Sequence, residues 1–205
     1  MGRNAESVNL PVTGMPLPMR FRPSRPLTDD ELYLFSATNE VAWIEREANG
    51  EISIKPISPT IVGAVSADVS CDLAQWLERE GRRGELLLGA GFFLPDGSML
   101  GPRLALLSPE KWAVIVNREK DGFAPFAPDF VVEFDGPFDE TGEMARKMGR
   151  WAANGVQLGW LIDPFEKIIT IYRPGAEPEE YVNPSSLQGT GPIAGFELVL
   201  QRVWG

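Results

Sequence analysis

The residues best suited to chemistry in this 205-residue chain are carboxylates and a lysine in its second half. Asp129, Glu133 and Asp135 lie in or beside the apolar run 130–134, and Lys147 follows in a helical pattern. The chain contains no histidine, which excludes Ser-His-Asp and Cys-His catalysis and histidine-ligated zinc. Any hydrolysis would therefore use carboxylates, a lysine and a hard divalent metal such as magnesium.

Spacing along a strand limits which carboxylates can share an ion. Side chains alternate between the two faces of a strand, so Asp129, Glu133 and Asp135 all point the same way. At the usual rise per residue, Asp129 and Glu133 are about 13 Å apart, which is too far to ligate one ion unless the strand bends. Glu133 and Asp135 are about 6.6 Å apart, so these two are candidates to share a metal.

Each of these side chains also has a structural interpretation. Asp129 follows a proline and could satisfy backbone donors at the entrance to the strand. Glu133 is surrounded by valines and phenylalanines, and a buried carboxylate must be paired or bound to a metal. Its structural partner would be Lys147 or Arg103, through a salt bridge. Lys147 borders an apolar stripe, so a solvated lysine with a buried stem competes with a role in the site.

The elements that would position these residues follow from the hydrophobic pattern. Thr28 and Glu31 fit a capping box that begins a short helix. Residues 42–56 fit a hairpin around Asn49-Gly50. Apolar residues at helical spacing predict a helix over 62–80, where Cys71 is interpreted as a buried, inert thiol.

The second half of the chain predicts a sheet with helices packed on it. Strands are expected at 85–88, 91–94, 104–107, 130–134, 158–162, 168–172 and 196–200, and a helix at 140–153. Residues 111–126 are interpreted as an irregular connection and 174–192 as a surface loop. Asp163 is interpreted as a turn residue, and Trp43, Trp151 and Trp160 as core aromatics. The fold class predicted is α/β, with a flexible arm over residues 1–26 and one domain over 27–205.

The composition of the chain limits which partners it can bind and where in the cell it is expected. A net charge of −10 argues against strong non-specific nucleic-acid binding, but it leaves room for a locally basic cleft. The first 26 residues lack the apolar core of a signal peptide, and no run in the chain is long and apolar enough for a membrane span. We therefore expect a cytoplasmic protein that is not in a membrane.

Several ordered segments of the chain resemble the Uma-type restriction endonuclease family, within the PD-(D/E)XK nuclease superfamily. They include Trp43-Ile44-Glu45-Arg46, the run Gly91-Phe92-Phe93-Leu94-Pro95-Asp96-Gly97, Pro128-Asp129-Phe130-Val131-Val132-Glu133, Lys147-Met148, and Leu158-Gly159-Trp160-Leu161-Ile162-Asp163-Pro164. The resemblance spans roughly residues 27 to 200 and depends on the order of the segments.

The resemblance implies a restriction-endonuclease-like mixed sheet flanked by helices, a divalent metal such as magnesium, and DNA as the substrate. It implies that Glu45 is the acid of the first helical region, Glu133 the third-strand acid, and Lys147 a lysine that has migrated to the following helix. From the residues alone, Glu45 is equally compatible with plain hairpin surface. Nucleases of this type that cut both strands commonly dimerise, so a homodimer is also expected.

One position departs from the family pattern. The family's Pro-Asp before the second strand reads Pro102-Arg103 in this chain. An arginine there is expected to occupy the metal position and to pair with Glu133. Two functions therefore remain open at this point. The chain is either a metal-dependent endonuclease weakened by Arg103, or a catalytically inactive relative that acts through binding.

Overall fold

The computed structural model describes residues 11–57, 59–81, 84–118, 122–136 and 142–204. These residues form two compact units. The described part of the first unit comprises residues 11–57, 91–101 and 122–126, and that of the second comprises 59–81, 84–90, 102–118, 127–136 and 142–204. Neither unit is continuous in sequence, because the chain leaves the first unit after residue 57 and returns to it twice.

The first unit is a five-stranded sheet with one helix packed on it. The strand order is β1-β3-β2-β6-β5, and every pairing is antiparallel. The strands are β1 (Met19–Phe21), β2 (Ala42–Arg46), β3 (Ile52–Pro56), β5 (Phe92–Phe93) and β6 (Met99–Leu100), and the helix is α1 (Asp29–Ala37). Leu32 and Phe35 of α1 pack with Ile44, Ile52 and Ile54 of the hairpin.

Two local predictions in this unit are confirmed. Thr28 accepts a hydrogen bond from the Glu31 backbone N–H, and the Glu31 carboxylate accepts one from the Thr28 backbone N–H. This reciprocal pair is the capping box read from the sequence. The predicted hairpin is β2 and β3, with Gly50 at a φ of 83° in its turn, a backbone region that favours glycine.

The predicted N-terminal arm, residues 1–26, is packed over part of its length. Met19–Phe21 forms the edge strand β1 against β3, and Val12 is buried and hydrogen-bonded to Asn39. Over residues 12–21 the structure therefore differs from the lightly packed arm that was expected. The reason is tertiary: the edge of β3 offers hydrogen-bond partners to a segment with no strong pattern of its own. Residues 1–10 lie outside the described residues.

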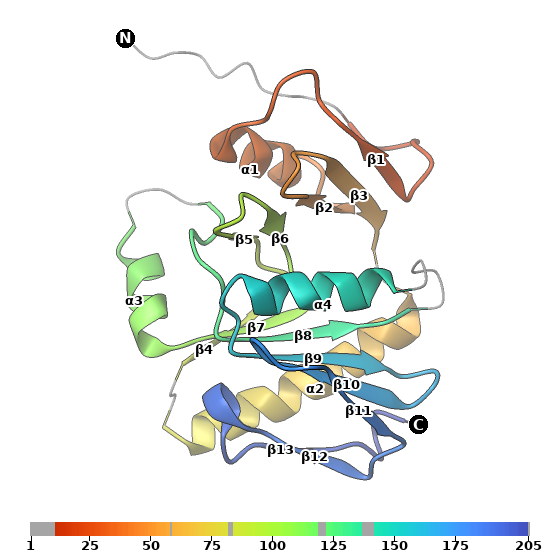
Figure 1. Ribbon diagram of the computed structural model, residues 1–205, viewed down its shortest axis with the longest axis vertical. Helices are drawn as coiled ribbons and strands as arrows, with labels where there is room; N and C mark the ends of the chain where they lie inside the picture. The colour runs from red at the N-terminus through yellow and green to blue at the C-terminus, as the bar shows by residue number, and fades with distance from the viewer. Residues whose placement is uncertain (1–10, 58, 82–83, 119–121, 137–141, 205) are drawn as a thin grey trace. The chain divides into compact units, whose positions relative to one another are not determined.

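The second unit is built on a six-stranded mixed sheet (Figure 1). Its strand order is β11-β10-β9-β8-β7-β4, with β8 and β9 parallel and the other neighbours antiparallel. The elements are β4 (Glu85–Leu88), β7 (Leu104–Leu107), β8 (Phe130–Phe134), β9 (Leu158–Asp163), β10 (Ile168–Tyr172), β11 (Glu179–Val182), α2 (Thr60–Arg79), α3 (Pro109–Val116) and α4 (Glu143–Ala153). A hairpin of β12 (Ser186–Gln188) and β13 (Glu197–Val199) completes the unit, with a 3-10 turn at Gly191–Ile193 between its strands.

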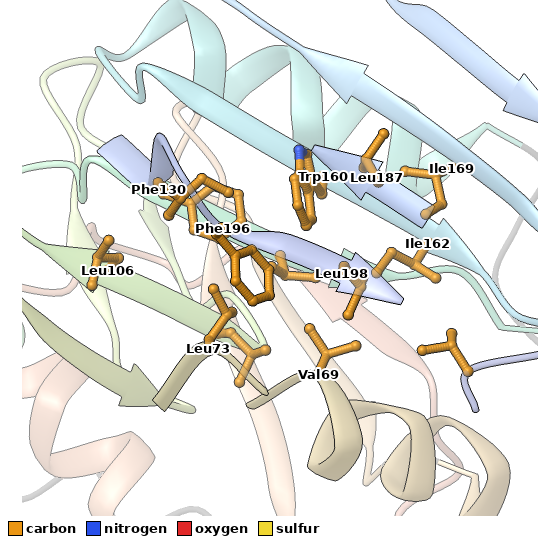
Figure 2. Close-up of a cluster of buried hydrophobic side chains, with 14 of the residues drawn as sticks. Val69, Leu73, Leu106, Phe130, Trp160, Ile162, Ile169, Leu187, Phe196 and Leu198 are labelled. Atoms are coloured by element: carbon orange, nitrogen blue, oxygen red, sulfur yellow. The ribbon is translucent and has the colours of Figure 1, made fainter. Parts of the chain in front are cut away.

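The two faces of this sheet carry different helices. Alternate residues of the central strands, such as Val132 and Trp160, join α2 and the β12–β13 hairpin in the main core. Figure 2 shows Trp160 and Phe196 among the side chains of that core, with Val69 and Leu73 of α2 beside them. The intervening residues of β8 and β9 face α4 on the opposite side.

Most predicted elements of this unit are confirmed, and two expected loops are corrected. Residues 111–126 were expected to be irregular, but α3 occupies Pro109–Val116 and is capped by Ser108, whose side chain accepts from Lys111 N–H. Residues 174–192 were expected to be loop, but they contain β11 and β12. Both elements are short, and β11 pairs with β10 through exposed residues, so hydrophobic periodicity gave no sign of it.

Predictions for single residues are also partly confirmed and partly corrected. Asp163 accepts hydrogen bonds from the backbone N–H groups of Phe165 and Glu166, which confirms its turn role. Trp151 and Trp160 are buried, as predicted. Cys71 was interpreted as buried and is exposed. The apolar stripe of α2 runs through Val69 and Leu73, which places Cys71 on the other side of the helix.

The architecture is therefore mixed α/β, as predicted. In the part of the chain that the structure describes, no helix has the length and apolar character needed to cross a membrane.

Candidate active site beneath helix α4

A buried ion pair joins the centre of the sheet to helix α4. Lys147 Nζ lies 2.7 Å from Glu133 Oε1, and the two side chains are 7% and 2% exposed. Trp151 Nε1 donates to the same carboxylate oxygen at 3.1 Å. The predicted approach of Glu133 and Lys147 is confirmed, and the interpretation of Lys147 as a solvated flank is wrong, because the whole side chain is buried.

The sequence predicts this geometry through helical periodicity. Lys147 and Trp151 are four residues apart, so they lie one above the other on the same face of α4. Met144 and Met148 complete that buried face. The role of Trp151 was missed at the sequence level, because an indole in an apolar pattern is interpreted as core. Its spacing from Lys147 was the available signal.

Close packing holds α4 against the sheet. Gly159 of β9 lies under Met148, and a Cβ built on Gly159 would lie 2.5 Å from Met148 Cε. Gly159 pairs with Val131 on one side and with Tyr172 on the other. The absence of a side chain at position 159 lets the helix approach the sheet closely enough for Lys147 to reach Glu133.

Asp135 extends the same strand beyond Glu133. Its backbone N–H donates to Ile162 O at 2.9 Å, which continues the pairing of β8 with β9. Two residues beyond Glu133, its side chain is directed to the same face. Nearby, burial raises the pKa of the Tyr172 hydroxyl, and the negative charges of Asp135 and Glu180 raise it further. Tyr172 pairs with Gly159, so it lies in the row of Val131, and the charge of Asp135 acts on its hydroxyl from farther along the sheet.

Arg103 directly precedes β7, next to the last residue that pairs with β8. Leu104 of β7 pairs with Val132 of β8 in an antiparallel ladder. Extending that register by one residue brings Arg103 opposite Glu133. Leu104 belongs to the α2-side core, so if the extended conformation continued to Arg103, its side chain would point to the α4 side. The expected pairing of its guanidinium with Glu133 stays a prediction.

Asp129 forms an anchor at the start of β8. One carboxylate oxygen accepts from Lys111 Nζ at 2.8 Å and from Gln157 Nε2 at 2.9 Å, and the other accepts from Ser108 N–H at 2.8 Å. These contacts tie β8 to the start of α3 and to the turn before β9. Asp129 therefore fills the structural role considered for it, the satisfaction of donors at the strand entrance. Its role as a metal ligand stays a proposal.

Glu45 belongs to the first unit. It is buried, at 4% exposure, and its Oε1 accepts from the Gly101 backbone N–H at 2.9 Å. The interpretation of Glu45 as exposed hairpin surface is therefore wrong. A buried carboxylate in a β-hairpin needs such donors, and Gly101 supplies one from the segment that follows β6.

The donor set suits a magnesium ion completed by its substrate. Magnesium is usually held by one or two carboxylates, with waters and substrate phosphates completing the octahedron. Glu133 and Asp135 supply two carboxylates from neighbouring positions of one face. Within the described residues, no group of three or more His, Cys, Asp or Glu side chains gathers around one point. These residues fit a weakly held ion that arrives with a phosphate, and a high-affinity resident ion would need more ligands.

The chain matches the Uma2 family, described as a putative restriction endonuclease, over residues 30–201. It is also similar to the crystal structure of a putative nuclease of DUF820 from Anabaena variabilis. That structure is 24% identical, with a TM-score of 0.69 over 87% of this chain and 98% of the other. No curated protein matches the chain.

The fold is mixed α/β and is similar to that of the putative nuclease from Anabaena variabilis. Because the family match covers most of its length, the chain belongs to the Uma2 family.

Proposed function

We propose that this protein is a divalent-metal-dependent endonuclease that hydrolyses DNA phosphodiester bonds and is weakened by Arg103. The observation that carries the proposal is the buried contact between Lys147 and Glu133 on the face of a nuclease-like sheet. A buried carboxylate and ammonium in such a fold provide the two charges that phosphodiester hydrolysis requires, a ligand for a metal and a cation for the transition state.

We assign each side chain of the candidate site a role in phosphodiester hydrolysis. Glu133 and Asp135 would bind the metal, with Asp129 as a further candidate ligand. The metal, when bound, lowers the pKa of a coordinated water and offsets negative charge on the phosphate. Lys147 would stabilise that charge through its ammonium group. The indole N–H of Trp151, which donates to Glu133, would help to hold the carboxylate in place.

Arg103 would reduce metal binding at this site. A guanidinium opposite Glu133 can pair with the carboxylate and supply the positive charge that the ion would bring. The same feature supports the second candidate function, in which the chain is inactive as a nuclease and acts as a binding or interaction module. In either case we place the protein in the cytoplasm. We propose a homodimer for the active form, because two copies supply two sites for the two strands of DNA.

A metal-dependent cleavage assay tests the proposal. Wild-type protein is incubated with supercoiled plasmid in Mg²⁺ or Mn²⁺, and binding of the same ions is measured by calorimetry. We expect slow nicking that Glu133→Gln abolishes, while Asp72→Asn, which removes a charge from a surface pair with Arg202, leaves the rate unchanged. Nicking that persists undiminished in Glu133→Gln would contradict this site. Binding of DNA with no cleavage in either ion would favour the binding module.

A further inference from the structure

The outer face of helix α4 has a composition that packing does not explain. Met144, Lys147, Met148 and Trp151 form its buried face. At 100° per residue the opposite side carries Arg146, Gly149 and Ala153, which are all exposed. Arg150 lies on the flank of this side and is half-buried. The exposed side therefore combines arginine with residues that have little or no side chain.

Gly149 is the unusual member of this face. Glycine in the middle of a helix is unfavourable, because it loses the most backbone freedom on folding. Packing accounts for Gly159, whose missing side chain makes room for Met148. No such reason applies to Gly149, since a Cβ built there would meet nothing within 4 Å. Gly149 therefore leaves the backbone of α4 open to an approaching molecule.

The charge of this helix differs from that of the chain. The protein has a net charge of −10, with 19 basic and 29 acidic residues. Helix α4 carries Arg146, Lys147 and Arg150 against a single acid, Glu143. Lys147 is paired with Glu133 inside the unit. The two arginines thus place positive charge on the outer side of α4, the helix whose inner side carries Lys147, in a protein with a net charge of −10.

We propose that this outer face of α4, defined by Arg146, Gly149, Arg150 and Ala153, contacts the phosphate backbone of DNA. The inference rests on the proposed nuclease function and deepens it by naming the surface that positions the substrate. Two arginines flanking small residues let a bulky polyanion approach the helix and receive charge-assisted hydrogen bonds.

The test measures DNA binding without cleavage. Fluorescence anisotropy with a labelled 20-base-pair duplex in EDTA is run over a series of salt concentrations for wild type, Arg146→Gln/Arg150→Gln, Arg146→Gln and Arg79→Gln. Arg79 is an exposed arginine on α2, across the sheet from α4, so Arg79→Gln controls for the loss of one positive charge elsewhere, and Arg146→Gln alone is its matched partner. We expect the double variant to bind about tenfold more weakly, with a log–log salt slope shallower by about two. Arg79→Gln should match wild type.

The possible outcomes separate this inference from the proposed function. A double variant that binds DNA as wild type does, with the same salt slope, would overturn the α4 surface even if the protein is a nuclease. Loss of binding in the double variant supports the surface even if wild type fails to cut in Mg²⁺ or Mn²⁺. Wild type that binds polyglutamate as tightly as the duplex would mean that an acidic protein is the partner, and would overturn the assignment to DNA. Wild type that neither binds nor cuts DNA would refute both proposals.

Discussion

Lys147 Nζ lies 2.7 Å from Glu133 Oε1, and both side chains are almost completely buried. Removing one member of a buried pair leaves an uncompensated charge, whereas replacing both with apolar groups does not. We therefore expect Lys147→Met to lower the free energy of unfolding by about 3 to 5 kcal/mol. The double variant Glu133→Leu/Lys147→Met should be closer to wild type than either single variant. Urea denaturation of the four proteins measures this cycle, and strictly additive effects would contradict a direct pair.

The fit of Met148 over Gly159 gives a second prediction. Gly159→Ala places a Cβ against Met148 Cε and should cost about 1 to 3 kcal/mol, since a close-packed interface must shift. Met148→Leu removes the ε carbon, so in the double variant the cost should be less than the sum. Gly149→Ala is the matched control, because its Cβ meets nothing and it should stabilise the helix by about 0.5 to 1 kcal/mol. Equal effects at the two glycines would show that the close approach is not what constrains Gly159.

Replacing Asp129 should lower the free energy of unfolding. Asp129→Asn removes the charge that Lys111 Nζ contacts and weakens the hydrogen bonds at the start of β8. Because hydrogen bonds to charged groups are the stronger ones, a loss of about 1.5 to 3 kcal/mol is expected in thermal or urea unfolding. Calorimetry with Mg²⁺ on the same variant checks the other role proposed for this residue. A clear fall in metal affinity with little change in stability would identify Asp129 as a ligand instead of an anchor.

Arg103→Asp restores a carboxylate at the position where the family has one. In the sheet register this carboxylate would be opposite Glu133, so metal affinity and plasmid nicking should both rise. Without metal, losing the guanidinium and adding a second acid should cost about 1 to 3 kcal/mol of stability. Arg103→Gln is the control that removes the cation without adding a ligand. If Arg103→Asp and Arg103→Gln bind Mg²⁺ equally, Arg103 does not occupy the metal position.

The capping box predicts a pH dependence of stability in the first unit. The Arg25 guanidinium, followed by the Thr28 backbone N–H, lowers the pKa of Glu31 from 4.5 to about 2. A carboxyl whose pKa is lower when folded stabilises the protein above its unfolded pKa, and this contribution fades as the pH falls from about 4.5 toward 2. The melting temperature of Glu31→Gln should therefore be lower than that of wild type at pH 7, and the difference should shrink as the pH falls to 3. A difference that is constant with pH would contradict this.

The sequence by itself determined the local elements and the chemical type of the site. Thr28 and Glu31 predict the start of their helix, because a capping box is a contact between residues three apart in the sequence. The strand 130–134 and the helix ending near Asn154 follow from periods of two and 3.6 residues. The lack of histidine limits the chemistry to carboxylates and lysine. Glu133 in an apolar strand was recognisable as a residue that needs a partner, because unpaired buried charge is costly.

Only the tertiary structure decided which partners meet. Strand β1 is packed because β3 offers it an edge, and Val12 is held by a hydrogen bond from its backbone N–H to Asn39; no pattern within residues 11–21 encodes either partner. The short helix α3 has no buried residues, and its start is fixed by Asp129, which contacts Ser108 and Lys111 from 18 or more residues along the chain. The way α4 lies on the sheet also decides two contacts. Trp151 donates a hydrogen bond to Glu133, and Met148 packs over Gly159. Contacts between residues distant in sequence follow from packing a whole surface, which local propensities cannot specify.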